Sequence, residues 1–137
     1  EINKKHRIHF AGTVNEKDVL CYYKLFSIHI LPSTTEGFSQ ALLEAMALHI
    51  PVIATNASGN NELITHGENG FLFDDNDCKG LAELINTLRD SKELRKRFSE
   101  RGHLTALKTY SIERTIGGYE KLFTDCINGR RCNSLYP

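Results

Sequence analysis

Short apolar runs alternate with longer segments of helical periodicity along most of this chain. The apolar runs predict strands at 7–11, 27–31, 51–55 and 70–73. The segments after them repeat apolar residues at helical spacing and predict helices at 16–26, 38–49, 59–65 and 77–90. This alternation is typical of a parallel sheet with helices on both faces, joined by right-handed crossovers. We therefore expect an α/β, Rossmann-like fold.

Two further helical patterns follow the predicted sheet, at 92–109 and 112–128. The first carries a basic cluster at 95–101, in which Glu93 and Glu100 are interspersed. This mixture of signs favours a solvated helix face over a membrane or nucleic-acid surface.

The run from Glu36 to Glu44 is the most informative part of the chain. It places two carboxylates on either side of a strand-loop-helix junction, Glu36 at the helix mouth and Glu44 inside the helix. At about 1.5 Å per helical residue, they would lie roughly 12 Å apart along the axis. Between them lie the first free N–H groups of the helix, a natural seat for phosphate, and Gly37 allows a ligand to approach the backbone. The spacing suggests a sugar, a diphosphate and a ribose in line.

A purely structural interpretation of this pair has to be considered as well. Acidic residues are common in the first turn of a helix, so Glu36 alone would be unremarkable. Glu44 differs, because its neighbours at 42–48 make the helix apolar nearly all round. An unpaired buried carboxylate is costly, so Glu44 requires a partner, either protein or ligand, and we favour a ligand.

Several motifs together resemble one known family. They are Ile8–Gly12, Leu31–Ser33, Glu36–Phe38, Leu43–Ala47, Pro51–Thr55, Glu62–Ile64, His66–Leu72 and Asp77. This set resembles the carboxyl-terminal, donor-binding domain of retaining GT-B glycosyltransferases of family 4. The resemblance extends to about Tyr119. We predict a partial nucleotide-sugar-binding domain at 1–125 and a carboxyl-terminal tail at 126–137.

The resemblance implies a role for each matching residue. Glu44 would accept hydrogen bonds from the ribose hydroxyls, and Glu36 would be the catalytic residue, beside the hydroxyls of the transferred sugar. Further donor-binding residues would be Gly37, Phe38, Ser39 and Gln40, which hold the sugar and the diphosphate, with Thr13 and Val14 beside the base. The implied reaction transfers a hexose, with retention, from a nucleotide-sugar to a glycan or lipid-linked acceptor in polysaccharide biosynthesis. The donor is a substrate; no cofactor and no protein-bound metal is expected.

In that family the donor domain begins earlier, with a glycine-rich turn and a basic pair that clamp the diphosphate, and an amino-terminal acceptor domain precedes it. Neither is present in these 137 residues. We therefore hypothesise that this chain is a fragment, or a truncated gene product, of a longer enzyme. Its partner would be the missing acceptor domain of the parent chain. We expect the isolated chain to bind nucleotide weakly and to transfer little sugar.

The composition excludes several classes of function. Lys and Arg total 17, as do Asp and Glu, so the chain has no basic footprint for nucleic acid. No apolar stretch approaches the roughly 20 residues of a transmembrane segment, and no signal-peptide pattern is present. The four cysteines, at 21, 78, 126 and 132, lack zinc spacing and favour reduced thiols in a cytoplasmic protein over a Cys126–Cys132 disulfide. Membrane association of the parent stays open.

Two local features have simple structural interpretations. The acidic run at 74–77 follows a predicted strand and precedes a helix, so an N-cap at Asp77 explains it better than a metal site. His29 lies in a predicted strand and is expected to be a core histidine with satisfied hydrogen bonds.

Other functions remain open at this level. One is a non-catalytic nucleotide-sugar-binding module, and another is a non-hydrolysing sugar-nucleotide epimerase, although the pattern at 36–44 argues against the latter. A phosphoacceptor domain is less favoured, because no aspartate ends an early strand. The base, sugar and acceptor are not encoded in any pattern that we recognise.

Overall fold

A computed structural model describes residues 8–35, 37–57 and 59–129. In these residues a parallel sheet has the order β1-β2-β3, with strands β1 (His29–Leu31), β2 (Val52–Thr55) and β3 (Phe71–Phe73). The helices are α1 (Glu16–Tyr23), α2 (Gln40–Ala47), α3 (Asn60–Leu63), α4 (Cys78–Asp90), α5 (Lys92–Tyr110) and α6 (Ile112–Ile127). The predicted α/β alternation is confirmed from α1 onward.

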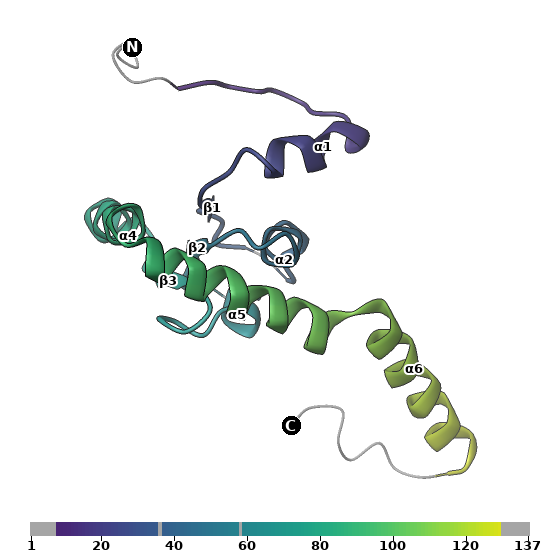
Figure 1. Ribbon diagram of the computed structural model, residues 1–137. Helices are drawn as coiled ribbons and strands as arrows, with labels where there is room; N and C mark the ends of the chain where they lie inside the picture. Colours follow the sequence, from purple (N-terminus) through teal and green to yellow (C-terminus); the bar gives the residue numbers. More distant parts are fainter. Residues whose placement is uncertain (1–7, 36, 58, 130–137) are drawn as a thin grey trace.

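Helices cover both faces of this sheet, as the alternation predicts. All four residues of β2 are buried, and neighbouring side chains enter different clusters. Val52 and Ala54 pack with α2 and α3, whereas Ile53 packs on the opposite face with α4 residues such as Leu88. Figure 1 shows α2 and α4 on opposite sides of the strands. A central parallel strand buried on both faces explains why the run at 51–55 is continuously apolar.

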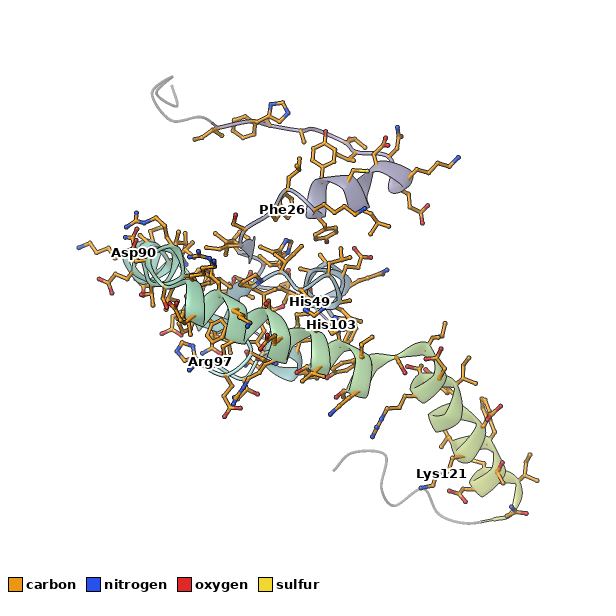
Figure 2. All side chains as sticks on the ribbon, in the orientation of Figure 1. Phe26, His49, Asp90, Arg97, His103 and Lys121 are labelled. Atoms are coloured by element: carbon orange, nitrogen blue, oxygen red, sulfur yellow. The ribbon has the colours of Figure 1, made fainter. Side chains whose placement is uncertain are left out.

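Helix α5 packs against the hydrophobic clusters on both faces of the sheet, because it crosses from one side of the sheet to the other. Phe98, in its first half, packs with α4 and β3, whereas Ala106, near its end, packs with α2. At the contact between α2 and α5, His49 and His103 lie side by side (Figure 2). The helix that follows the sheet in the sequence therefore holds both layers together.

The predicted strand at 7–11 is wrong for the residues that the structure describes. Residues 8–11 form no strand, and the side chains of Ile8 and Phe10 are 53% and 75% exposed. An alternating sequence forms a strand only when a neighbouring strand takes up its backbone hydrogen bonds and a core covers one face. Among the described residues, no strand pairs with this segment and no core covers one of its faces.

Helix α6 runs continuously from Ile112 to Ile127 and projects from the sheet domain (Figure 1). It includes Cys126, where we predict the tail to begin, and that division into domain and tail stays a prediction. Cys132 lies outside the described residues. Among the described residues, no helix combines the length and apolar character of a membrane span.

Candidate functional site

The candidate site is the junction between β1 and α2. Helix α2 begins at Gln40, two residues later than predicted, because Ser39 is its N-cap. The Ser39 side chain is buried and its Oγ accepts a hydrogen bond from the Leu42 N–H at 3.4 Å. Ser39 thus supports the start of the helix, and the N–H groups of Gln40 and Ala41 are left for a ligand or solvent at the helix mouth.

Glu36, the predicted catalytic residue, lies outside the described residues, so its predicted distance from Glu44 is not tested. Gly37 is exposed, and no described atom beyond its neighbours lies within 4 Å of where a Cβ would stand. Phe38 is partly exposed, and its ring lies 5.3 Å from that of Tyr110 at the end of α5. Tyr110 in turn donates a hydrogen bond to the Glu62 carbonyl oxygen at 3.0 Å. This chain of contacts links the loop before α2 to α5 and α3.

Glu44 is half-buried, not fully enclosed, and it has a protein partner. Its carboxylate accepts a hydrogen bond from the Gln40 side-chain amide at 3.1 Å, one helical turn earlier. The phenol of Tyr23, from α1, is near enough for the Glu44 charge to act on it, but it donates its hydrogen bond to the Ala41 carbonyl oxygen at 3.2 Å. Glu44 therefore has a protein partner, one of the two kinds that the sequence analysis allowed, and a ligand at this position stays a prediction. A half-exposed carboxylate that accepts from the Gln40 amide still has acceptor capacity for a ligand.

Two titratable rings lie near this carboxylate. Burial, together with the nearby charge of Glu44, raises the pKa of Tyr23 to about 12, so the phenol is a proton donor at neutral pH. Burial lowers the pKa of His29, against the opposing effect of the Glu44 charge. His29 Nε2 is buried without a hydrogen-bond partner among the described residues, so the prediction of a satisfied histidine is wrong. The environment of Glu44 thus combines a negative charge with a neutral imidazole and a neutral phenol.

Asn60 organises the loops at the carboxyl ends of the strands, a role that the sequence analysis missed. Its fully buried Nδ2 donates to the carbonyl oxygen of Thr55, at 3.0 Å, and to that of Ser33, at 3.5 Å. It therefore connects the end of β2 to the loop that leads from β1 to α2. Its Oδ1 is buried and has no partner in the described part of the chain. The signal in the sequence was an asparagine directly after a glycine, Gly59. In the structure Gly59 has a φ of +87°, which favours glycine.

Thr13 and Val14, expected beside the base, lie in the segment before α1. Thr13 is exposed and Val14 is half-buried. Within the described residues, the Thr13 hydroxyl makes no hydrogen bond to α2, and a place for these two residues beside the base stays a prediction. At the expected sheet edge, however, the Asn56 amide after β2 donates to the Asp74 carboxylate after β3 at 3.3 Å.

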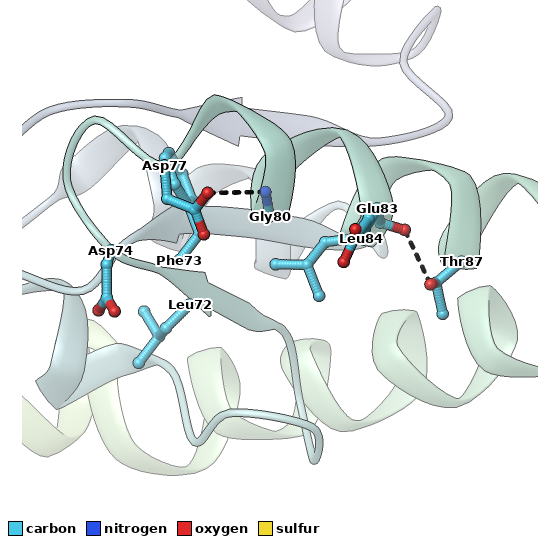
Figure 3. Close-up of a pocket in the computed structure, with 8 residues that line it drawn as sticks. All are labelled: Leu72, Phe73, Asp74, Asp77, Gly80, Glu83, Leu84 and Thr87. Carbon is cyan, nitrogen blue, oxygen red and sulfur yellow. Dashed lines mark hydrogen bonds between the residues drawn. The ribbon is translucent and has the colours of Figure 1, made fainter.

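A pocket of about 320 Å³ lies beside β3 and α4 (Figure 3). Its acidic lining includes Asp77, whose Oδ1 accepts a hydrogen bond from the Gly80 N–H at 2.9 Å. The predicted N-cap is therefore confirmed. A Cβ on Gly80 would stand 2.1 Å from the Asp77 Oδ2, so a larger residue there would require this carboxylate to turn.

Comparisons with known proteins agree with this architecture. The profile of the family described as "Glycosyl transferases group 1" matches residues 1–105. An uncharacterized glycosyltransferase from Haemophilus influenzae is 38% identical over 100 residues, which cover 72% of this chain and 28% of that protein. The chain spans about a third or less of the length of the curated relatives it matches.

Solved structures resemble the same region. The C-terminal domain of a glycosyl transferase group 1 family protein from Francisella tularensis has a TM-score of 0.69 at 28% identity, covering 75% of this chain and 53% of its own. The Anabaena protein HepE in complex with UDP has a TM-score of 0.73 at 27% identity, with 78% and 30% covered. The chain described above therefore belongs to the glycosyl transferase group 1 family, with the α/β, Rossmann-like architecture of GT-B glycosyltransferases.

Proposed function

We propose that this chain is the donor-binding domain of a retaining glycosyltransferase that transfers a hexose from a nucleotide-sugar. The observation that carries the proposal is the Glu44 carboxylate, which is half-buried on α2 and accepts a hydrogen bond from the Gln40 side chain. A carboxylate can accept two adjacent hydroxyl groups at once, as the ribose of a nucleotide presents them. The presence of UDP in the HepE structure supports a nucleotide ligand for this fold.

The remaining donor contacts are part of the same proposal. The free N–H groups at the start of α2 would hold the diphosphate, with Gly37, Phe38, Ser39 and Gln40 around it. Ser39 would act through its backbone and its cap, since its hydroxyl already supports the helix. Glu36 would lie beside the transferred sugar as the catalytic residue. A base contact by Thr13 and Val14 would require the segment before α1 to approach α2.

The reaction itself would be mainly a matter of positioning. The transition state of a glycosyl transfer carries positive charge on the sugar and negative charge on the departing diphosphate. The helix dipole of α2 would stabilise the diphosphate. The acceptor, a glycan or a lipid-linked sugar, would be bound by a further domain of the parent protein. We expect little turnover by the 137-residue chain alone, and measurable sugar transfer by it would contradict that expectation.

Calorimetric titration with UDP, GDP and ADP tests the proposal. One nucleotide should bind, and Glu44→Gln should weaken it about tenfold or more, the loss of one good charged hydrogen bond. Glu113→Gln is the matched control, because Glu113 is an exposed carboxylate in the first turn of α6. No binding by a folded sample, or equal losses in both variants, would contradict a donor site at Glu44.

A further inference from the structure

The loop that leads into α2 has few anchors in its own backbone. Within the described residues, the backbone of Gly37 and Phe38 makes no hydrogen bond. Gly37 has no side chain to hold it, and no described atom beyond its chain neighbours lies within 4 Å of its Cβ position. The buried Ser39 cap fixes the last residue of the loop. The position of the loop before Ser39 therefore depends on the Phe38 side chain.

Phe38 contacts Tyr110, the last residue of α5. The centroids of the two rings are 5.3 Å apart and their planes are tilted by 52°, which lies within the range of favourable aromatic pairs. Phe38 is still 44% exposed, so its ring is not enclosed by the core. The contact with Tyr110 therefore attaches a side chain at the surface to a helix that is distant in the sequence.

Tyr110 itself is fixed to the fold in two ways. Its side chain packs against the hydrophobic cluster that includes Met46 of α2 and Ala106 of α5. Its hydroxyl donates a hydrogen bond of 3.0 Å to the carbonyl oxygen of Glu62, in the last turn of α3, where carbonyl groups lack partners within the helix. Tyr110 thus connects the Phe38 ring to three helices.

We propose that Tyr110 is a positioning residue for donor binding, which fixes the Phe38 ring and thereby the loop whose N–H groups would face the diphosphate. This inference rests on the proposed function of the start of α2. Tyr110 does not contact the donor in this arrangement; it acts through Phe38. A loop that is already held in its bound conformation loses less conformational entropy on binding, so Tyr110 contributes affinity indirectly.

A double-mutant cycle tests whether Tyr110 acts through Phe38. Calorimetric titration would compare the natural chain with Tyr110→Leu, Phe38→Leu and the double variant, using whichever of UDP, GDP and ADP binds the natural chain. Tyr110→Leu should weaken binding about threefold to tenfold, which corresponds to the loss of one aromatic pair. In the Phe38→Leu background it should change the affinity by about twofold or less. Equal effects in both backgrounds, or no effect in the natural one, would overturn the inference.

The corresponding nucleoside monophosphate separates positioning from a general loss of structure. It keeps the ribose that Glu44 would bind, but it lacks the second phosphate that the loop would hold. Tyr110→Leu should therefore weaken binding of the monophosphate less than binding of the diphosphate, by about twofold or less. Equal losses for both nucleotides would overturn the positioning role.

Tyr119 provides a matched control. It is an exposed tyrosine of α6, which projects from the sheet domain (Figure 1), and its ring stacks with that of Phe123 at a centroid distance of 6.3 Å. Tyr119→Leu therefore also removes one aromatic pair, but it should leave nucleotide affinity unchanged. A loss equal to that of Tyr110→Leu would overturn a specific role of Tyr110. Thermal unfolding of each variant verifies that the compared samples are folded.

A second measurement needs no ligand. NMR order parameters of the Gly37 and Phe38 amides should fall toward about 0.6, the range of flexible backbone, in Tyr110→Leu and in Phe38→Leu. Phe38→Leu changes only a partly exposed side chain, so it tests the same contact even if Tyr110→Leu does not fold. Tyr119→Leu should leave these order parameters unchanged.

Unchanged order parameters in Phe38→Leu and Tyr110→Leu would overturn the inference even if nucleotide binds. Conversely, absence of UDP, GDP and ADP binding by the folded natural chain contradicts the proposed function, whereas binding with an additive cycle contradicts only the role of Tyr110.

Discussion

The imidazole rings of His49 and His103 stack with their centroids 3.7 Å apart and their planes at 17° (Figure 2). His49 lies just after α2, with a φ of +59°, and His103 lies in the middle of α5. His103 Nδ1 is 2.7 Å from the Ala47 carbonyl oxygen, which can only accept, so this nitrogen donates the hydrogen bond. The end of α2, where carbonyl groups lack partners within the helix, is thereby attached to α5.

His103→Ala should therefore destabilise the fold. The substitution removes a hydrogen bond and a stacked ring between two packed helices, a loss of about 1–2 kcal/mol in the free energy of unfolding. Chemical denaturation measures it. Leu104→Ala is the control, because the adjacent Leu104 is nearly half exposed and should cost no more than about 0.5 kcal/mol. Equal losses would show that the His103 contacts contribute nothing specific.

Asn60→Ala should cost about 1–3 kcal/mol, because it leaves the buried carbonyl groups of Thr55 and Ser33 without the amide that joins them. Asn61→Ala should be close to neutral, since Asn61 is exposed at the next position of α3. If Asn60 also positions the loop before α2, its variant should bind UDP more weakly even where it remains folded. Urea denaturation and calorimetry separate these two effects, and a stable Asn60→Ala variant would contradict the structural role.

Two glycines should respond to alanine substitution with opposite signs. A Cβ on Gly70 would stand 2.8 Å from Val52 Cγ2 and 3.0 Å from the Val52 carbonyl oxygen. Gly70→Ala therefore forces the packing against β2 apart and lowers the free energy of unfolding by about 1–3 kcal/mol.

Gly117 lies in α6, and no described atom outside its own helix backbone lies within 4 Å of its Cβ position. Gly117→Ala should stabilise α6 by about 0.5–1 kcal/mol through helix propensity.

Thermal and chemical unfolding measure both changes, with the helical circular dichroism signal as a probe of α6. A destabilised Gly117→Ala variant would indicate that α6 does not continue through this position. A neutral Gly70→Ala variant would indicate that Gly70 does not pack tightly against β2.

His29 makes stability depend on pH in a predictable direction. Its folded-state pKa lies below the ordinary value of about 6.5, so the unfolded chain binds a proton more readily. The stabilising contribution of the neutral imidazole is present at higher pH and is lost as the pH falls below about 6.5 toward the folded-state pKa. Between about pH 7.5 and pH 5, His29→Phe should therefore lose less stability than the natural chain.

Urea denaturation at both pH values measures this difference. His9→Asn is the control, because it removes a histidine at an exposed position before α1. A pH dependence of His29→Phe equal to that of the natural chain would show that His29 is not responsible.

Features that depend only on neighbouring residues could be predicted from the sequence. The continuous apolar run at 51–55 predicts a strand buried on both faces, and the structure confirms it as β2. The cap at Asp77 follows from an acidic residue that ends a loop before a helical pattern, and it is also confirmed. These features are local, because hydrogen bonds within a turn and the spacing of apolar side chains are set by residues only a few positions apart.

Features that need a partner from elsewhere in the chain appear only once the chain is folded. The alternating segment at 8–11 forms no strand, since pairing requires a second strand that the local pattern cannot supply. Glu44 is accompanied by Tyr23 from α1, 21 positions earlier in the sequence, and Asn60 reaches back to Ser33. Periodicity identifies which face of a helix is apolar, but it does not identify which distant polar group will meet that face. The carboxylate was therefore predictable from the sequence, whereas its neighbours outside α2 depend on how α1 packs against α2.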